Sequence, residues 1–176
     1  MYLVDFYKSY HMRVVVYAAL AVLVTGCSGI EQPFEYIHLP GTEPAAGANM
    51  PFTSAIQVRS GNIVFLSGTV GAPSPHSHPH IPSEFDHLDF SPEAQTIRVM
   101  ESVKEAVEAA GGQLTDIVRV TRFVRNVGEN QDAINEVMNR YWGPSHRPAS
   151  TTVEIVRLAT DPRFILEVEA VAVIPN

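Results

Sequence analysis

The architecture of this chain is most clearly visible in residues 91–127, SPEAQTIRVMESVKEAVEAAGGQLTDIVRVTRFVRNV. Ser91 is a favoured N-cap residue and Pro92 suits the first helical position, so we predict that a helix begins here. The glycine pair at 111–112 ends it. Its expected buried stripe consists of Ile97, Met100, Val103, Val107 and Ala110. Residues 117–127 are rich in β-branched residues and predict a strand directly after the helix.

The same alternation continues toward the C-terminus. Residues 131–142 predict a second helix, because apolar side chains recur at the i, i+3, i+4 and i+7 positions of one face. These side chains are Ile134, Val137, Met138 and Tyr141. Residues 149–157 and 164–174 predict two further strands, joined by a turn around residues 160–162.

Toward the N-terminus, two short apolar runs at residues 55–59 and 63–67 flank Ser60-Gly61-Asn62, which is typical of a hairpin. Residues 68–90 are rich in proline and histidine and predict a loop. The order β-β-α-β-α-β-β lets both helices cover one face of a mixed sheet. We therefore expect a two-layer α+β domain, with no internal repeat and no second domain.

The composition places the chain among ordinary globular proteins. Its 176 residues are 45% hydrophobic and 18% charged, which suits one domain and excludes a disordered or collagen-like chain. The formal net charge of −7 is a poor match to a nucleic-acid backbone. A single cysteine, Cys27, excludes an internal disulfide.

An uncharged run of eleven residues, 14–24, precedes this cysteine. It is too short to span a membrane, which takes about 20 apolar residues. Arg13 lies before the run and small residues lie at its end, which is typical of an export signal. With Cys27 next, the stretch resembles the lipobox of bacterial lipoproteins, in which that cysteine is lipidated. The alternative is a buried strand or helix beside an unrelated cysteine.

This interpretation divides the chain into a signal peptide (residues 1–26), a lipidated flexible tether (27–49) and a folded domain (50–176). The start codon is either Met1 or Met12. Ser28, rather than aspartate, follows the cysteine, so we expect a lipid anchor at the periplasmic face of the outer membrane. Removal of the signal, whose formal charge is +1, leaves a domain with a charge of −8.

Hydrogen-bonding side chains gather on the two C-terminal strands, which we expect to be neighbours. Ser150, Thr152 and Glu154 share one face of the first strand, and Glu167 and Glu169 share one face of the second. One interpretation is a solvated outer face of the sheet. The other is a polar pocket in which a carboxylate orients a water molecule.

Several short blocks resemble the RidA (YjgF) family in order and in spacing, over about residues 48–174. The blocks are PFTSA (51–55), SGNIVFLSG (60–68), VKEAVEAAG (103–111), DIV (116–118), IN (134–135), RPASTTVE (147–154) and LEVEA (166–170). This resemblance implies a chorismate-mutase-like fold and a homotrimer with ligand clefts between adjacent subunits. Active members hydrolyse enamines and imines to a 2-oxo acid and ammonia, and no cofactor is expected for that reaction.

The resemblance also implies roles for individual residues. Glu167 matches the family's water-positioning glutamate, whereas Ser150 stands where active members have an arginine that holds the substrate carboxylate. Thr152, Phe52 and Thr69 stand where cysteine, tyrosine and glutamine are common, and all three are candidate ligand contacts. We therefore expect a small-molecule cleft with weak or absent 2-imino-acid deamination. The alternative is an enamine/imine deaminase that depends on Glu167.

The loop before the first helix contains PHSHPH, with His76, His78 and His80. Imidazoles so close together suit Zn²⁺, Ni²⁺ or Cu²⁺, which makes these three residues weak metal candidates. Their alternation lacks the i, i+4 spacing of a helical metal site, so the favoured interpretation is a longer loop that borders the cleft. The expected partners are thus a small molecule, further copies of the chain and a membrane, but no nucleic acid.

Overall fold

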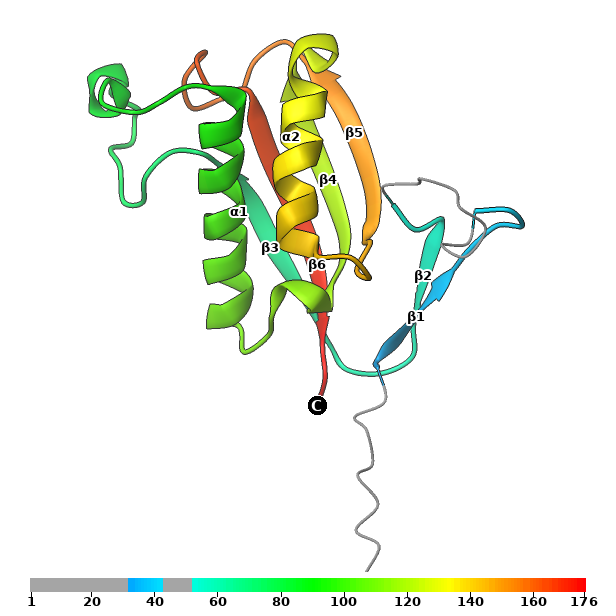
Figure 1. Cartoon of the computed structure of the whole chain (residues 1–176). Helices are drawn as coiled ribbons and strands as arrows, with labels where there is room; N and C mark the ends of the chain where they lie inside the picture. Colours follow the sequence, from blue (N-terminus) through cyan, green and yellow to red (C-terminus); the bar gives the residue numbers. More distant parts are fainter. Residues whose placement is uncertain (1–31, 43–51) are drawn as a thin grey trace, which may run out of the picture. The chain divides into compact units, whose positions relative to one another are not determined.

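Two helices lie side by side on one face of a four-stranded sheet in the computed structural model of this protein (Figure 1). The structure describes residues 32–42 and 52–176. The helices are α1 (Pro92–Ala109) and α2 (Val127–Trp142), with short 3-10 turns η2 (Pro82–Phe85) and η3 (Leu114–Asp116). The strands are β1 (Phe34–Ile37), β2 (Ala55–Val58), β3 (Asn62–Val70), β4 (Ile117–Arg125), β5 (Ala149–Ile155) and β6 (Leu166–Ile174).

The main sheet has the strand order β3-β6-β4-β5. The β3–β6 and β6–β4 pairs are antiparallel, and the β4–β5 pair is parallel. A parallel pair needs a crossover, and α2 supplies it. The predicted two-layer α+β fold, with a mixed sheet and both helices on one face, is confirmed.

Helix α1 begins as predicted but turns a slightly different face inward. The Ser91 hydroxyl accepts a hydrogen bond from the Ala94 amide, and Gly111 has a positive φ of 88° just beyond the helix. Met100, Val103 and Val107 are buried as predicted, whereas Ile97 and Ala110 are exposed. Gln95, Thr96 and Val99 are buried in their place.

Gln95 accounts for part of this difference, because its buried side chain bonds three backbone groups beside the helix. Its amide nitrogen donates to the carbonyls of Phe90 and Arg163, and its oxygen accepts from the Ile165 amide. A buried polar residue therefore belongs to the inner face, although a hydrophobic pattern excludes it.

The predicted hairpin between residues 55–59 and 63–67 is wrong. Strand β2 pairs with β1, a strand inside the segment expected to be a flexible tether, while β3 pairs with β6. Gly61 lies between the two pairings with a φ of +89°, and a Cβ there would lie 2.7 Å from the Ile174 carbonyl oxygen. The turn signal thus marks a change of sheet, and the described domain begins before residue 50.

The two C-terminal strands are not neighbours either, because β4 lies between β5 and β6. Strand β5 follows a helical crossover and pairs at the edge of the sheet, parallel to β4. Two strands joined by a short turn were expected to pair, but the parallel pairing with β4 separates them.

Other boundaries moved by a few residues. Strand β3 extends to Val70 and η2 interrupts the expected loop over residues 68–90. Helix α2 begins at Val127, four residues before the predicted start, with Asn126 as its N-cap residue and Glu129 in its first turn. The Glu154 carboxylate of β5 accepts a hydrogen bond from the Val127 amide, a contact that no local pattern reveals.

Within the described residues, no helix is long and apolar enough to cross a membrane. The predicted signal peptide, Cys27 and the start of the tether lie outside the described residues, as do residues 43–51.

Candidate functional site

A cavity of about 640 Å³ lies where the end of β3 meets β6, α1 and the loop after β3. Of the residues singled out from the sequence, it brings together Thr69, Glu167 and the three histidines His76, His78 and His80. Glu105 of α1 also lines it. The charged side chains among its described lining residues are therefore both acids.

Glu167 reaches this cavity from β6, on the face of the sheet opposite the helices. Its register partners are Val70 of β3 and Phe123 of β4. A bulge in β3 between Leu66 and Thr69 brings Gly68 under the carboxylate, where an added Cβ would overlap Glu167 Oε1. The glycine therefore leaves room for this acid.

Burial raises the pKa of Glu167 above its ordinary value, and the nearby Glu169 carboxylate raises it further. Both causes disfavour the charged form. A carboxyl group shifted in this direction holds its proton nearer to neutral pH, which suits proton transfer to or from a ligand.

Thr69 approaches the cavity from the other side of β3. Its register partner is Val168, whose side chain is buried beneath the helices, so Thr69 lies beside Ser102 of α1 at the cavity wall. The β3 bulge thus lets two successive segments of one edge strand line the same space.

Ser150 and Thr152 lie elsewhere. Their register partners are Val120 and Arg122, which lie on the helix-covered face, whereas Glu167 lies on the opposite face. Within one chain, Ser150 and Thr152 are therefore separated from the predicted water-positioning acid by the sheet.

Ser150 lines a second, much smaller cavity of about 20 Å³, together with Arg122 of β4 and Asn135 of α2. Arg122 Nη1 donates a 2.6 Å hydrogen bond to Asn135 Oδ1, and Arg122 Nε is buried without a partner. Burial lowers the pKa of this guanidinium. This space holds about one water molecule and is too small for a 2-imino acid.

Two further residues, the predicted ligand contact Phe52 and the neighbouring cation Arg147, line neither of these cavities. Phe52 precedes β2, is 37% exposed and does not line the larger cavity. Arg147 has the guanidinium closest in sequence to Ser150. Its Nη1 donates hydrogen bonds to the backbone carbonyls of Gly143 and His146.

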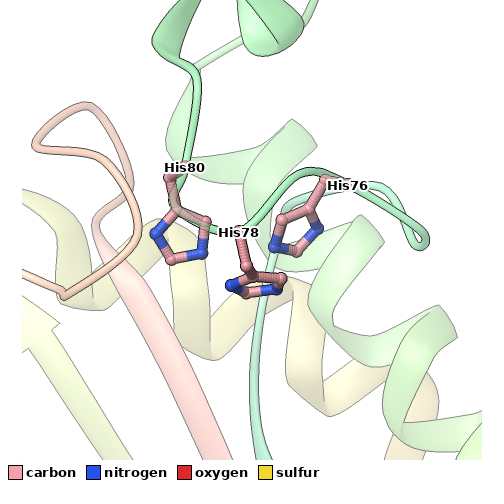
Figure 2. Close-up of side chains that lie close together, drawn as sticks. All are labelled: His76, His78 and His80. Atoms are coloured by element: carbon pink, nitrogen blue, oxygen red, sulfur yellow. The ribbon is translucent and has the colours of Figure 1, made fainter.

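The three histidines form a tight cluster in the loop after β3. Figure 2 shows their rings gathered on one side of the loop. The ring centroids are 4.5–5.2 Å apart. One ligand nitrogen from each ring lies within 4.8 Å of the others. Alternating positions of this irregular loop therefore bring the three side chains together.

Sequence reasoning missed Ser102 and Glu105, which line the cavity from α1. They lie three residues apart on the polar side of this helix, where most such residues only face solvent. The available signal was the resemblance block at residues 103–111, which contains Glu105 and directly follows Ser102.

These features define a class, the two-layer α+β proteins with an acid-bearing cavity at one end of a mixed sheet. The family model described as Endoribonuclease L-PSP matches residues 42–174. The chain belongs to this family, the RidA (YjgF) family.

Relatives of known name agree with this assignment. The chain is 34% identical to a RutC family protein of Pyrococcus abyssi, over 74% of this chain and 92% of the relative. It is also 34% identical to a 2-iminobutanoate/2-iminopropanoate deaminase of Dermatophagoides farinae, over 70% of this chain and 86% of that enzyme. A Rid-family structure from Yersinia pestis matches the fold with a TM-score of 0.63 at 24% identity, covering 81% of this chain and 99% of that one.

Proposed function

We propose that this protein is an exported, lipid-anchored RidA-family protein that binds a small molecule and deaminates ordinary 2-imino acids weakly or not at all. The observation that carries this proposal is the charge of the 640 Å³ cavity. Among its described lining residues, Glu105 and Glu167 are charged and neither lysine nor arginine is present. An anionic 2-imino acid would meet like charge there.

The size of the expected loss follows from the missing arginine. A hydrogen bond to a charged group contributes about 1.5–3 kcal/mol, and each 1.4 kcal/mol changes affinity roughly tenfold. With Ser150 at the position of the family arginine, binding of a 2-imino acid should weaken by roughly ten- to a hundredfold. Arg122 does not replace the missing arginine in this chain, because it is bonded to Asn135 of α2 and the space beside it is too small for a substrate.

A second candidate function is enamine or imine hydrolysis with Glu167 as the residue that positions water. Two observations favour it. A relative 34% identical to this chain is named a 2-iminobutanoate/2-iminopropanoate deaminase, and the pKa of Glu167 is raised in the direction that suits proton transfer.

Turnover of 2-iminopropanoate, generated in solution from alanine by an amino-acid oxidase, distinguishes these two functions. We expect little turnover by the wild type and a gain of at least tenfold for Ser150→Arg. Ser150→Ala is the matched control, because it removes the same hydroxyl without adding a charge, and we expect no gain. Wild-type turnover that Glu167→Gln abolishes would refute the binding-protein proposal and support the deaminase.

Self-association into a trimer is the second part of the proposal. The helix-free face of the sheet exposes Ile63, Phe65 and Val153, and Phe65 is 80% exposed. Apolar side chains that gather on one sheet face are typical of a surface that another subunit covers. A cleft between subunits would also bring residues of two chains together, which the separation of Ser150 from Glu167 requires.

Export and anchoring rest on the sequence of residues 13–27 alone. Three lipidated cysteines in one trimer would make membrane attachment effectively permanent. Fractionation of cells that express the wild type or Cys27→Ala tests the anchor, and the molar mass in detergent tests the trimer. We propose no nucleic-acid partner, because the acidic chain and the acidic cavity both oppose a phosphate backbone.

A further inference from the structure

The loop that carries the three histidines is held in place by side-chain hydrogen bonds. Ser77, between two of the three histidines, donates hydrogen bonds to Glu84 from its amide (2.9 Å) and from its hydroxyl (2.5 Å). The middle of the PHSHPH segment is thus tied to η2.

The η2 turn is itself held to the body of the domain. Phe85 is fully buried against Phe164 and packs edge-on to the His76 ring at 5.7 Å. Arg163 binds the Asp86 carboxylate at 2.8 Å and the Pro82 carbonyl at 2.7 Å. The loop therefore rests on packed and hydrogen-bonded groups, which limits the positions of the histidines.

The His76 ring is oriented for metal binding. Its Nδ1 lies 2.7 Å from the Pro73 carbonyl oxygen, and a carbonyl only accepts, so Nδ1 carries the proton. The neutral ring then presents the lone pair of Nε2. A backbone carbonyl on the second ring nitrogen is the usual support of a metal-bound histidine.

The spacing of the three rings suits one ion. Zinc binds imidazole nitrogen at about 2.0–2.1 Å, which places neighbouring ligand nitrogens about 3.4 Å apart. The three nitrogens already lie within 4.8 Å of one another, so each pair needs to close by at most about 1.4 Å. His78 is the exposed member of the three, so its ring is the freest to rotate toward the other two.

We propose that His76, His78 and His80 bind a divalent transition-metal ion of the zinc class at the wall of the 640 Å³ cavity. Three imidazoles leave a fourth coordination position for water or a ligand, and the cavity that all three residues line supplies the space. The acids Glu105 and Glu167 in the same wall favour a cation there. This inference does not depend on whether the protein deaminates imino acids.

Calorimetric titration with Zn²⁺ tests the site. The protein is the full chain carrying Cys27→Ser, so that its thiol does not bind zinc, and it has no polyhistidine tag. We expect one ion per chain, and an affinity that falls at least roughly 10- to 100-fold in each of His76→Ala, His78→Ala and His80→Ala, since loss of a group that merely supports a ligand already costs this much. His87→Ala is the matched control, because this exposed histidine belongs to the same loop but not to the cluster, and we expect no change.

Unfolding curves without metal ensure that the variants are folded. Titration with Co²⁺ adds a spectroscopic test, because the absorption bands of a low-coordinate nitrogen site should appear in the wild type and the His87→Ala variant and disappear in the cluster variants. Three results would overturn the proposal: no binding by the wild type, unchanged affinity in His78→Ala, or an equal loss in His87→Ala.

Discussion

Arg122 and Glu167 lie on adjacent strands of one sheet, yet their side chains have opposite surroundings. Arg122 points under α2, bonds Asn135 and lines a space of about 20 Å³. Glu167 points to the helix-free face and lines a cavity of about 640 Å³. Burial shifts both pKa values toward the neutral form, but only the acid has room for a ligand. The sheet face on which a charged residue lies, and how deeply it is buried, thus determine whether it can reach a ligand more than the sequence motif around it does.

The largest expected effect on stability comes from Arg122, on the helix-covered face of the sheet. Arg122→Ala removes a half-buried side chain and leaves Asn135 Oδ1 without its donor, so the free energy of unfolding should fall by about 2 kcal/mol. For a chain of this size the melting temperature should drop by roughly 4–8 °C.

Chemical denaturation of the variant and of Arg119→Ala checks this prediction. Arg119 is exposed on the same strand, and its removal should change stability by less than about 0.5 kcal/mol. Equal stability of the two variants would mean that Arg122 packs no better than a surface arginine, and the contrast with Glu167 would disappear.

A smaller effect on stability is expected at Gly68, which lines the 640 Å³ cavity. Gly68→Ala places a Cβ against the Glu167 carboxylate and forces that side chain to turn away. Because the carboxylate is the flexible end of a half-exposed residue, the cost should be about 1 kcal/mol.

Gly128→Ala is the matched control. Gly128 lies in α2 with nothing within 4 Å of an added Cβ, so alanine should raise stability by up to about 1 kcal/mol. Thermal unfolding that shows both glycine variants stabilised would contradict the close approach of Gly68 to Glu167.

The sequence predicted much of the fold because its elements carry local signals. Ser91-Pro92 marks the start of α1, and the apolar stripe of α2 identifies its buried side. Strand pairing has no such signal. The parallel β4–β5 pair and the β1–β2 ribbon depend on contacts between distant segments, so the expected hairpin and the expected neighbours were wrong.

The candidate site was predictable only in part, for the same reason. Alternation correctly placed Ser150 with Thr152, and Glu167 with Glu169, on shared strand faces. It did not reveal that β4 separates the two pairs or that they face opposite ways. The closeness of the three histidines depends on η2 and on the Ser77–Glu84 bonds, which lie outside any periodic pattern.

The smallest expected effect has the opposite sign and concerns the acid itself. Glu167 has a raised pKa in the folded protein, so its carboxyl binds its proton more tightly when folded than when unfolded. The stability linked to this group is fully present below its ordinary value of 4.5 and is lost as the pH rises through the raised value. At pH 7 the charged carboxylate therefore destabilises the fold, and Glu167→Gln should be more stable than the wild type by less than about 1 kcal/mol, since solvent screens a half-exposed group.

The pH dependence makes this prediction specific. The advantage of Glu167→Gln should appear above about pH 4.5 and vanish below it, as denaturation at a series of pH values will show. Glu169→Gln should give a smaller gain, because it removes the repulsion between the two acids but leaves the partial burial of Glu167 unchanged. A wild type that is the more stable protein at pH 7 would mean that a favourable partner, such as a cation from another subunit, holds the carboxylate in its charged form. In that case Glu167 would lie in a packed interface between subunits. Its surroundings would then no longer differ from those of Arg122 beneath α2.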